Sequence, residues 1–164
     1  MGDGYSEKGQ FPFVDRLNLD NLTTKRIYES NYTDKLENLV DFDVNKNQLL
    51  VTIESKNDYP NYYFKTLNGK KITRITDFNN PFEQLSKVDK QVITYKRNDG
   101  VELSGVLYLP VSYNKTSKEK MPMIMWAYPR EFKDKTSAGQ NTNNPNKFTY
   151  PYYGSMVYWV TKGY

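Results

Sequence analysis

Residues 62–76 read YYFKTLNGKKITRIT and give a strong local structural signal. Two runs rich in aromatic and β-branched residues, 62–66 and 71–76, flank the pair Asn68-Gly69. Both Asn and Gly adopt positive φ readily, which a tight hairpin turn requires. The stretch therefore predicts a β-hairpin.

Further strands are expected upstream of this hairpin, over residues 11–19, 25–29, 39–43 and 48–55, with polar turns between them. Strands separated by about 8–12 residues are typical of a sandwich, a barrel or a propeller. Residues 15–28 and 62–75 also share a similar order of aromatic strand, turn and basic strand. Repetition at roughly 45 residues is what propeller blades produce.

Residues 77–90 are expected to form a linker, and the amino-acid composition changes after it. Residues 98–110 read NDGVELSGVLYLP, which predicts a hairpin with a strand over 91–97. Residues 122–128, PMIMWAY, are apolar at almost every position, as in a strand covered on both faces in an α/β fold. Residues 155–161 are expected to form one short helix that ends at Gly163.

The composition excludes several kinds of active site. The chain has 164 residues with no His and no Cys, so it contains neither a Ser-His-Asp triad nor a thiolate zinc site. We expect no cofactor and no metal; Asp41 and Asp43 could bind a cation but are expected to be a solvated strand edge. The net charge of +4 is spread out, which argues against nucleic acid as a partner. No apolar run approaches the ~18–20 residues that cross a membrane.

The ordered segments 98–110 and 122–132 resemble the start of the α/β-hydrolase domain in the prolyl oligopeptidase family of serine peptidases. The sequence WAYPREF, residues 126–132, is most similar to the glutamyl endopeptidase branch, as are FPFVDR (11–16) and AGQ (138–140). The first 80 or so residues resemble the last blade or two of that family's β-propeller. The resemblance covers nearly the whole chain in the same order.

The resemblance implies a mainly β fold with minor α. Residues 1–84 would be partial C-terminal blades of a propeller, and residues 85–164 the N-terminal part of the α/β-hydrolase peptidase domain. The chain would be a fragment of a peptidase that hydrolyses peptide bonds by acyl transfer, inactive alone because the family's triad would follow Tyr164. In the intact protein, Tyr128 would donate its hydroxyl to the oxyanion hole.

Two other readings stay open. A stand-alone β-rich module could bind carbohydrate or protein through its many Tyr and Asn side chains. Binding of single-stranded nucleic acid through Tyr stacking would need a concentrated stripe of basic residues, which the chain lacks. For the peptidase reading, a peptide is the expected partner of the parent protein, and the fragment is expected to self-associate through exposed strand edges. The sequence assigns no compartment, and a periplasmic or secreted parent stays open.

Overall fold

The computed structural model describes residues 1–6, 8–117, 120–127 and 143–164. They form two compact units. Unit 1 comprises Met1–Pro81 and Asn146–Phe148, and unit 2 the described residues of Phe82–Pro145 and Thr149–Tyr164. The chain therefore leaves unit 2 after Pro145, contributes three residues to unit 1, and returns. The assignment of residues 1–84 and 85–164 to two named domains stays a prediction.

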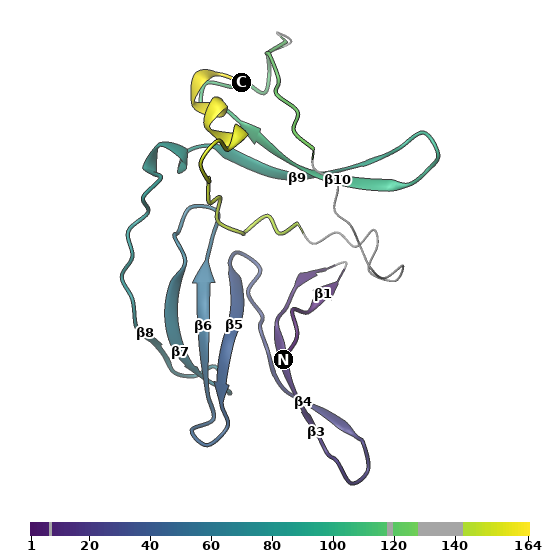
Figure 1. The fold of residues 1–164 in the computed structure, drawn as a ribbon, viewed down its shortest axis with the longest axis vertical. Coiled ribbons are helices and arrows are strands. Elements are labelled where there is room, and N and C mark those ends of the chain that lie inside the picture. The colour runs from purple at the N-terminus through teal and green to yellow at the C-terminus, as the bar shows by residue number, and fades with distance from the viewer. Residues whose placement is uncertain (7, 118–119, 128–142) are drawn as a thin grey trace. The chain divides into compact units, whose positions relative to one another are not determined.

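Unit 1 is built on a four-stranded antiparallel sheet (Figure 1). Its strands are β5 (Leu36–Asp43), β6 (Gln48–Glu54), β7 (Asn61–Thr66) and β8 (Ile72–Arg74), and they pair in the order of the chain. The predicted hairpin is confirmed: β7 pairs with β8, and Gly69 occupies the left-handed region at φ 68°. The strands expected at 39–43 and 48–55 are confirmed as well.

A second hairpin of unit 1 comprises β3 (Phe13–Leu17) and β4 (Thr24–Glu29), as the sequence predicts. Its register shifts between Val14 and Asp15, where a bulge interrupts the ladder. A short ladder of β1 (Tyr5–Ser6) with β2 (Gly9–Gln10) precedes it. That ladder has no alternating apolar pattern, so the sequence did not predict it.

The core of unit 1 lies between the β3–β4 hairpin and one face of the sheet. Val14 and Tyr28 of the hairpin pack against Leu49, Val51 and Ile53 of β6. Alternate residues of a strand point to the same face, so these three β6 residues form one continuous apolar row. Burying each aliphatic side chain contributes about 1.5–3 kcal/mol, which makes this row the main stabilising element of unit 1.

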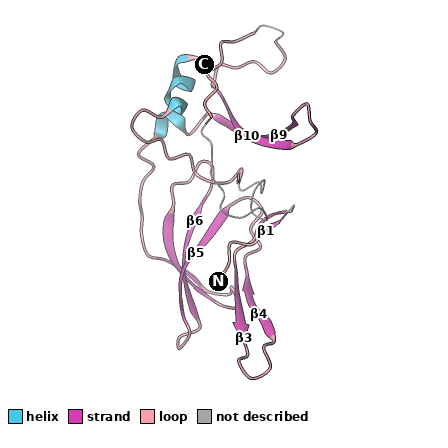
Figure 2. Cartoon of the chain, turned by 45° about the vertical axis from the view of Figure 1, so that its right-hand side comes forward, coloured by secondary structure: helices cyan, strands magenta, loops and turns pink. Residues whose placement is uncertain are grey.

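Unit 2 contains the antiparallel pair of β9 (Asp89–Lys96) and β10 (Glu102–Leu109), confirming the second predicted hairpin. Its helices are η1 (Glu83–Leu85) and η2 (Met156–Lys162), the latter cyan near the C-terminus in Figure 2. The expected helix is thus present and ends at Gly163, with φ 88°. It is a 3₁₀ helix rather than an α-helix, because it is short and rich in β-branched and aromatic residues.

The strand expected over residues 122–128 is wrong for the part that the structure describes. Residues 121–127 belong to no strand, and Met123 and Met125 are 73% and 80% exposed. Among the described residues β9 and β10 pair only with each other, so this run does not join their sheet as a third strand. The apolar run indicated burial without indicating which strand would supply the partner groups.

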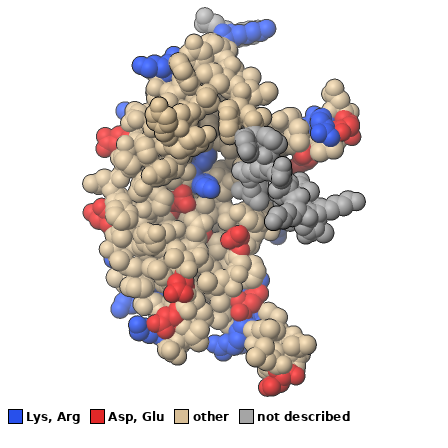
Figure 3. Space-filling model, in the orientation of Figure 1, with Lys and Arg blue, Asp and Glu red and all other residues tan. Residues whose placement is uncertain are grey.

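The charged surface agrees with the prediction of a dispersed positive charge. Figure 3 shows Lys and Arg side chains interspersed with Asp and Glu over the described surface of the face drawn. Neither η1 nor η2 is long and apolar enough to cross a membrane, and the described residues contain no other helix.

Candidate functional site

Tyr128, the predicted oxyanion donor, lies outside the described residues. Within them, the buried polar side chains lie in unit 1 and include two clusters on the sheet. One surrounds Glu37 and Lys65 and borders a cleft. The other surrounds Asn61 at the start of β7.

The first cluster contains a buried ion pair. The Lys65 ammonium lies 2.7 Å from Oε2 of Glu37, and the side chains are 7% and 0% exposed. The Tyr28 hydroxyl donates to the other Glu37 oxygen, Oε1. The Lys65 ammonium also lies 4.7 Å from the centre of the Tyr32 ring and 5.2 Å from that of Tyr28. Every charge in the cluster therefore has a close partner, as buried charges require.

The strand register brings these residues together. Lys65 pairs with Leu49, and Glu37 pairs with Ile53, so both lie on the core face of the sheet. Tyr28 reaches the same face from the β3–β4 hairpin. The polar cluster thus lies on the same face of the sheet as the apolar row of β6, with Glu37 and Lys65 on the two neighbouring strands.

Burial within this cluster keeps two phenols protonated. Burial and the hydrogen bond to Glu37 raise the pKa of Tyr28 well above its ordinary value. Burial, with the nearby charge of Glu37, raises the pKa of Tyr32 as well. Both hydroxyls are therefore donors over the whole physiological pH range, and neither acts as a general base.

A cleft of about 540 Å³ lies beside the cluster, and its lining includes Arg26, Glu29, Asn31, Tyr32, Asn68 and Lys70. Arg26 forms an ion pair with Asp15 at 2.5 Å and a second with Glu29, and stacks over the Phe13 ring at 3.7 Å. The hydrogen bond to Asp15 raises the pKa of the Arg26 guanidinium. Since the charges of Arg26 and Lys65 are matched, the cleft offers amides, aromatic rings and the Lys70 ammonium to a ligand.

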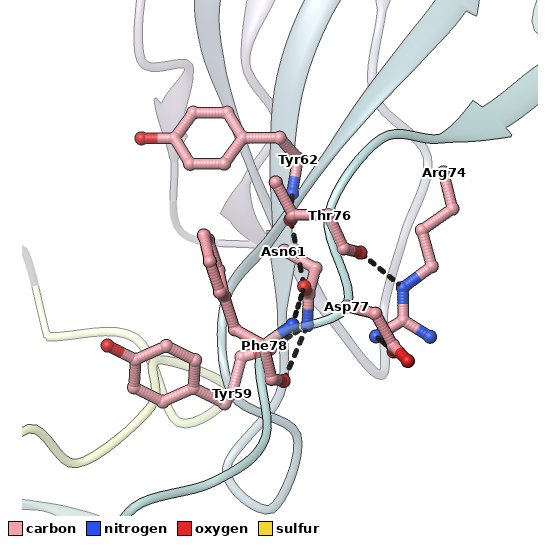
Figure 4. A network of polar contacts seen from close by, with 7 residues as sticks. All are labelled: Tyr59, Asn61, Tyr62, Arg74, Thr76, Asp77 and Phe78. Atoms are coloured by element: carbon pink, nitrogen blue, oxygen red, sulfur yellow. Dashed lines mark hydrogen bonds and ion pairs between the residues drawn. The ribbon is translucent and has the colours of Figure 1, made fainter.

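The second cluster is centred on the Asn61 side chain, drawn in Figure 4. Its Nδ2 donates to the carbonyls of Tyr59 and Phe78, both at 3.2 Å. Its Oδ1 accepts from the Phe78 N–H at 2.7 Å and from the Thr76 hydroxyl at 2.9 Å. One buried amide thus fixes the chain that leaves β8 against the start of β7.

Two charged residues border this network. The Arg74 guanidinium donates to the Thr76 carbonyl at 2.7 Å and lies 2.6 Å from Asp77 (Figure 4). A cavity of about 370 Å³ lies beside it, and its lining includes Lys35, Glu54, Tyr59 and Asn61. In both clusters the polar groups bond mainly to each other, so they are suited to holding the unit together and to shaping a surface.

The carboxylate of Asp43 completes a turn. It accepts from the backbone N–H groups of Asn45 and Lys46, both at 3.0 Å, and lies 3.3 Å from the Lys46 ammonium. These donors lower the pKa of Asp43. No three acidic side chains among the described residues converge on a point that could hold a metal ion.

Sequence reasoning missed Glu37, Lys65 and Asn61. The available signal was the position of Lys65 and Asn61 in the alternation of β7, where they share a face with Tyr63. A Lys and an Asn at core-facing positions indicate buried partners, because such groups are buried only when bonded.

No family model matches the chain. The chain is 33% identical over 172 residues to the probable chloroplastic glutamyl endopeptidase of Oryza sativa subsp. japonica, and 32% identical over 170 residues to that of Arabidopsis thaliana. These alignments include 99% and 98% of the chain but only 18% of each relative, so the chain spans less than a fifth of their length.

A solved structure, a variant of the AtxE2 isopeptidase with Astexin3-dC4 bound, shares 16% identity at a TM-score of 0.41. That match covers 69% of this chain and 18% of the isopeptidase chain. The sequence matches show that the chain is related to peptidases.

Proposed function

We propose that the chain is part of a serine peptidase of the prolyl oligopeptidase family, in its glutamyl endopeptidase branch. The observation that carries the proposal is the identity of 33% with a glutamyl endopeptidase along 99% of the chain. The whole protein would hydrolyse peptide bonds by acyl transfer, with cleavage after acidic residues.

The architecture of unit 1 supports a propeller assignment for residues 1–84. A propeller blade is a four-stranded antiparallel sheet, and β5–β8 form such a sheet in chain order. The β3–β4 hairpin covers one face of this sheet, as a neighbouring blade would. Residues 85–164 would then begin the α/β-hydrolase domain, with β9 and β10 as its opening hairpin.

In this proposal the chain holds one catalytic group, the Tyr128 hydroxyl, and no complete active site. Acyl transfer in this family needs a Ser nucleophile, a His base and an Asp that orients the His. The 164 residues contain no His, so the chain alone would not hydrolyse peptides. Tyr128 would stabilise the oxyanion once the triad is supplied by the rest of the protein.

The sequence of the gene beyond the codon for Tyr164 tests this proposal. We expect an open frame that encodes a Gly-x-Ser-x-Gly turn followed by an Asp and a His. The full protein should then react with a fluorophosphonate probe and cleave peptides after Glu. A stop codon, or a frame without a nucleophilic turn, would contradict the proposal.

The role of Tyr128 is tested in that full protein. We expect Tyr128→Phe to lower kcat by about 10²–10³-fold, the usual effect of removing an oxyanion donor. Tyr153→Phe is the matched control because Tyr153 is fully exposed in unit 2. An unchanged kcat for Tyr128→Phe would remove Tyr128 from the proposed site without affecting the peptidase assignment.

A further inference from the structure

Three residues far along the chain are part of unit 1. Asn146–Phe148 belong to this unit, while the described residues on both sides of them belong to unit 2. The segment is in no strand and pairs with no sheet. It is therefore held by side-chain contacts and single hydrogen bonds, not by a ladder.

Phe148 makes the principal contacts. Its backbone N–H donates to Oε2 of Glu54 at 2.7 Å. Its ring meets the Tyr59 ring edge to face, with 5.2 Å between centres, and the residue is 7% exposed. Two residues earlier, the Asn146 amide donates to the Thr33 carbonyl at 2.9 Å. Three independent contacts thus define the position of the segment on unit 1.

The groups that receive Phe148 are fixed by other parts of unit 1. Glu54 is 7% exposed, and its second oxygen accepts from the Asn38 amide at 3.1 Å. Tyr59 also packs edge to face on Phe78, at 6.5 Å, and Phe78 is bonded to Asn61. A buried carboxylate and an aromatic ring, both positioned by neighbours, form a receptor for a backbone N–H next to a Phe side chain.

We propose that Glu54 and Tyr59 form a docking site for a short aromatic peptide segment, and that Asn146–Phe148 is its intramolecular occupant. The segment acts as a clasp that holds residues 146–148 on unit 1. Because no ladder holds it, the clasp opens at a lower free energy than unfolding of the sheet. The inference is independent of peptidase activity.

Trypsin cleavage after Lys147 measures how often the clasp opens. The N–H of the Lys147–Phe148 peptide bond is the group that donates a hydrogen bond to Glu54. Cleavage needs the bond to leave the site, so its rate follows the open population. In the 164-residue chain we expect this bond to be cut at least ~10-fold more slowly than the Lys115–Thr116 bond, which lies in an exposed turn. Equal rates would overturn the proposal.

Variants test the assigned contacts. Phe148→Ala should raise the cleavage rate after Lys147 to that of the reference bond, whereas Tyr153→Ala, at a fully exposed aromatic residue, should not. Glu54→Gln keeps the shape of the side chain and should raise the rate several-fold, as expected for loss of a charge-assisted bond. Hydrogen exchange of the β6 amides reports whether the sheet stays folded. An unchanged cleavage rate in either folded variant would show the proposal to be wrong.

Discussion

The Nζ atom of Lys65 lies 2.7 Å from Oε2 of Glu37, although the two residues are 28 positions apart in the chain. They come from β7 and β5, on either side of β6, and their side chains are almost entirely buried. A buried pair contributes little net stability, but either charge left alone in the core is costly. This relationship leads to the first prediction.

Lys65→Met should destabilise unit 1 by about 3–5 kcal/mol, because it leaves the Glu37 carboxylate buried without its counterion. Glu37→Leu should have a similar effect, because it leaves the Lys65 ammonium buried without its counterion. The double variant should be much closer to wild type than the sum of the two single variants. Urea unfolding followed by circular dichroism measures all three free energies. Single variants within about 0.5 kcal/mol of wild type would show that the pair is not buried in solution.

The raised pKa of Tyr28 predicts loss of stability at alkaline pH. The phenol stays protonated in the folded state, while in the unfolded chain it ionises near its ordinary pKa of 10.0. Its contribution is therefore complete below pH 10 and declines above it, by up to about 1.4 kcal/mol per pH unit. The free energy of unfolding, measured from pH 8 to about pH 11.5, should show this decline.

Tyr28→Phe should make that decline shallower, and should cost about 1.5–3 kcal/mol at pH 7 because a hydrogen bond to a buried carboxylate is lost. Tyr153→Phe serves as the control, since Tyr153 is fully exposed. Identical pH profiles for wild type and Tyr28→Phe would disprove the assignment.

The Asn61 amide makes four hydrogen bonds that no other side chain can reproduce (Figure 4). Asn61→Leu should lower the free energy of unfolding by at least about 2 kcal/mol, because the N–H and C=O of Phe78 lose their buried partner. Asn61→Asp should also destabilise, since a carboxylate accepts but cannot donate to the two carbonyls. Asn57→Ala, at an exposed neighbouring position, should change stability by less than about 0.5 kcal/mol. Equal stabilities for Asn61→Leu and Asn57→Ala would contradict this account.

Strand positions could be predicted from the sequence because alternation and turn residues are local signals. The segments at 25–29, 48–55 and 62–66 lie within one residue of β4, β6 and β7. The buried partners of Lys65 could not be predicted, since Glu37 and Tyr28 are brought to it by register and by hairpin packing. The local pattern does not contain such long-range information.

One prediction was wrong, and a second left the helix type open. An apolar run such as residues 122–128 indicates that burial is favourable, but it does not specify which strand, if any, it will pair with. The helix expected over 155–161 with Gly163 as its stop is present at 156–162, where Ser155 is the N-cap and Gly163 the C-cap. The cap residues determine where the helix begins and ends. They do not determine whether its hydrogen bonds follow the 3₁₀ or the α pattern, which depends on helix length and side-chain crowding. The receptor for Phe148 was missed because the segment joins unit 1 only after a separation of 94 residues from Glu54.

The two glycines of the β9–β10 hairpin provide a test of backbone strain. Gly100 has φ 86°, and a Cβ added there would meet no atom within 4 Å, so Gly100→Ala isolates the cost of the left-handed conformation. That cost is about 1–2 kcal/mol. Gly105→Ala is the matched control, because its φ is ordinary and its Cβ would lie 3.9 Å from Ile93. Hydrogen exchange of the β9 amides should accelerate in Gly100→Ala and not in Gly105→Ala. Equal exchange in both variants would contradict the turn assignment.

The last prediction concerns self-association through strand edges. β8 is at the edge of the four-stranded sheet; Ile72 begins this strand and Ile75 follows it, and each is 46% exposed. An edge with unpaired backbone groups and apolar side chains favours pairing with another chain. Light scattering of the 164-residue chain should therefore give a mass that rises with concentration. Thr73→Lys, which places a charge on this edge, should reduce the association, whereas Thr116→Lys adds the same charge in an exposed turn and should not. A constant monomer mass in wild type, or equal masses for the two variants, would show that this edge is not the association surface.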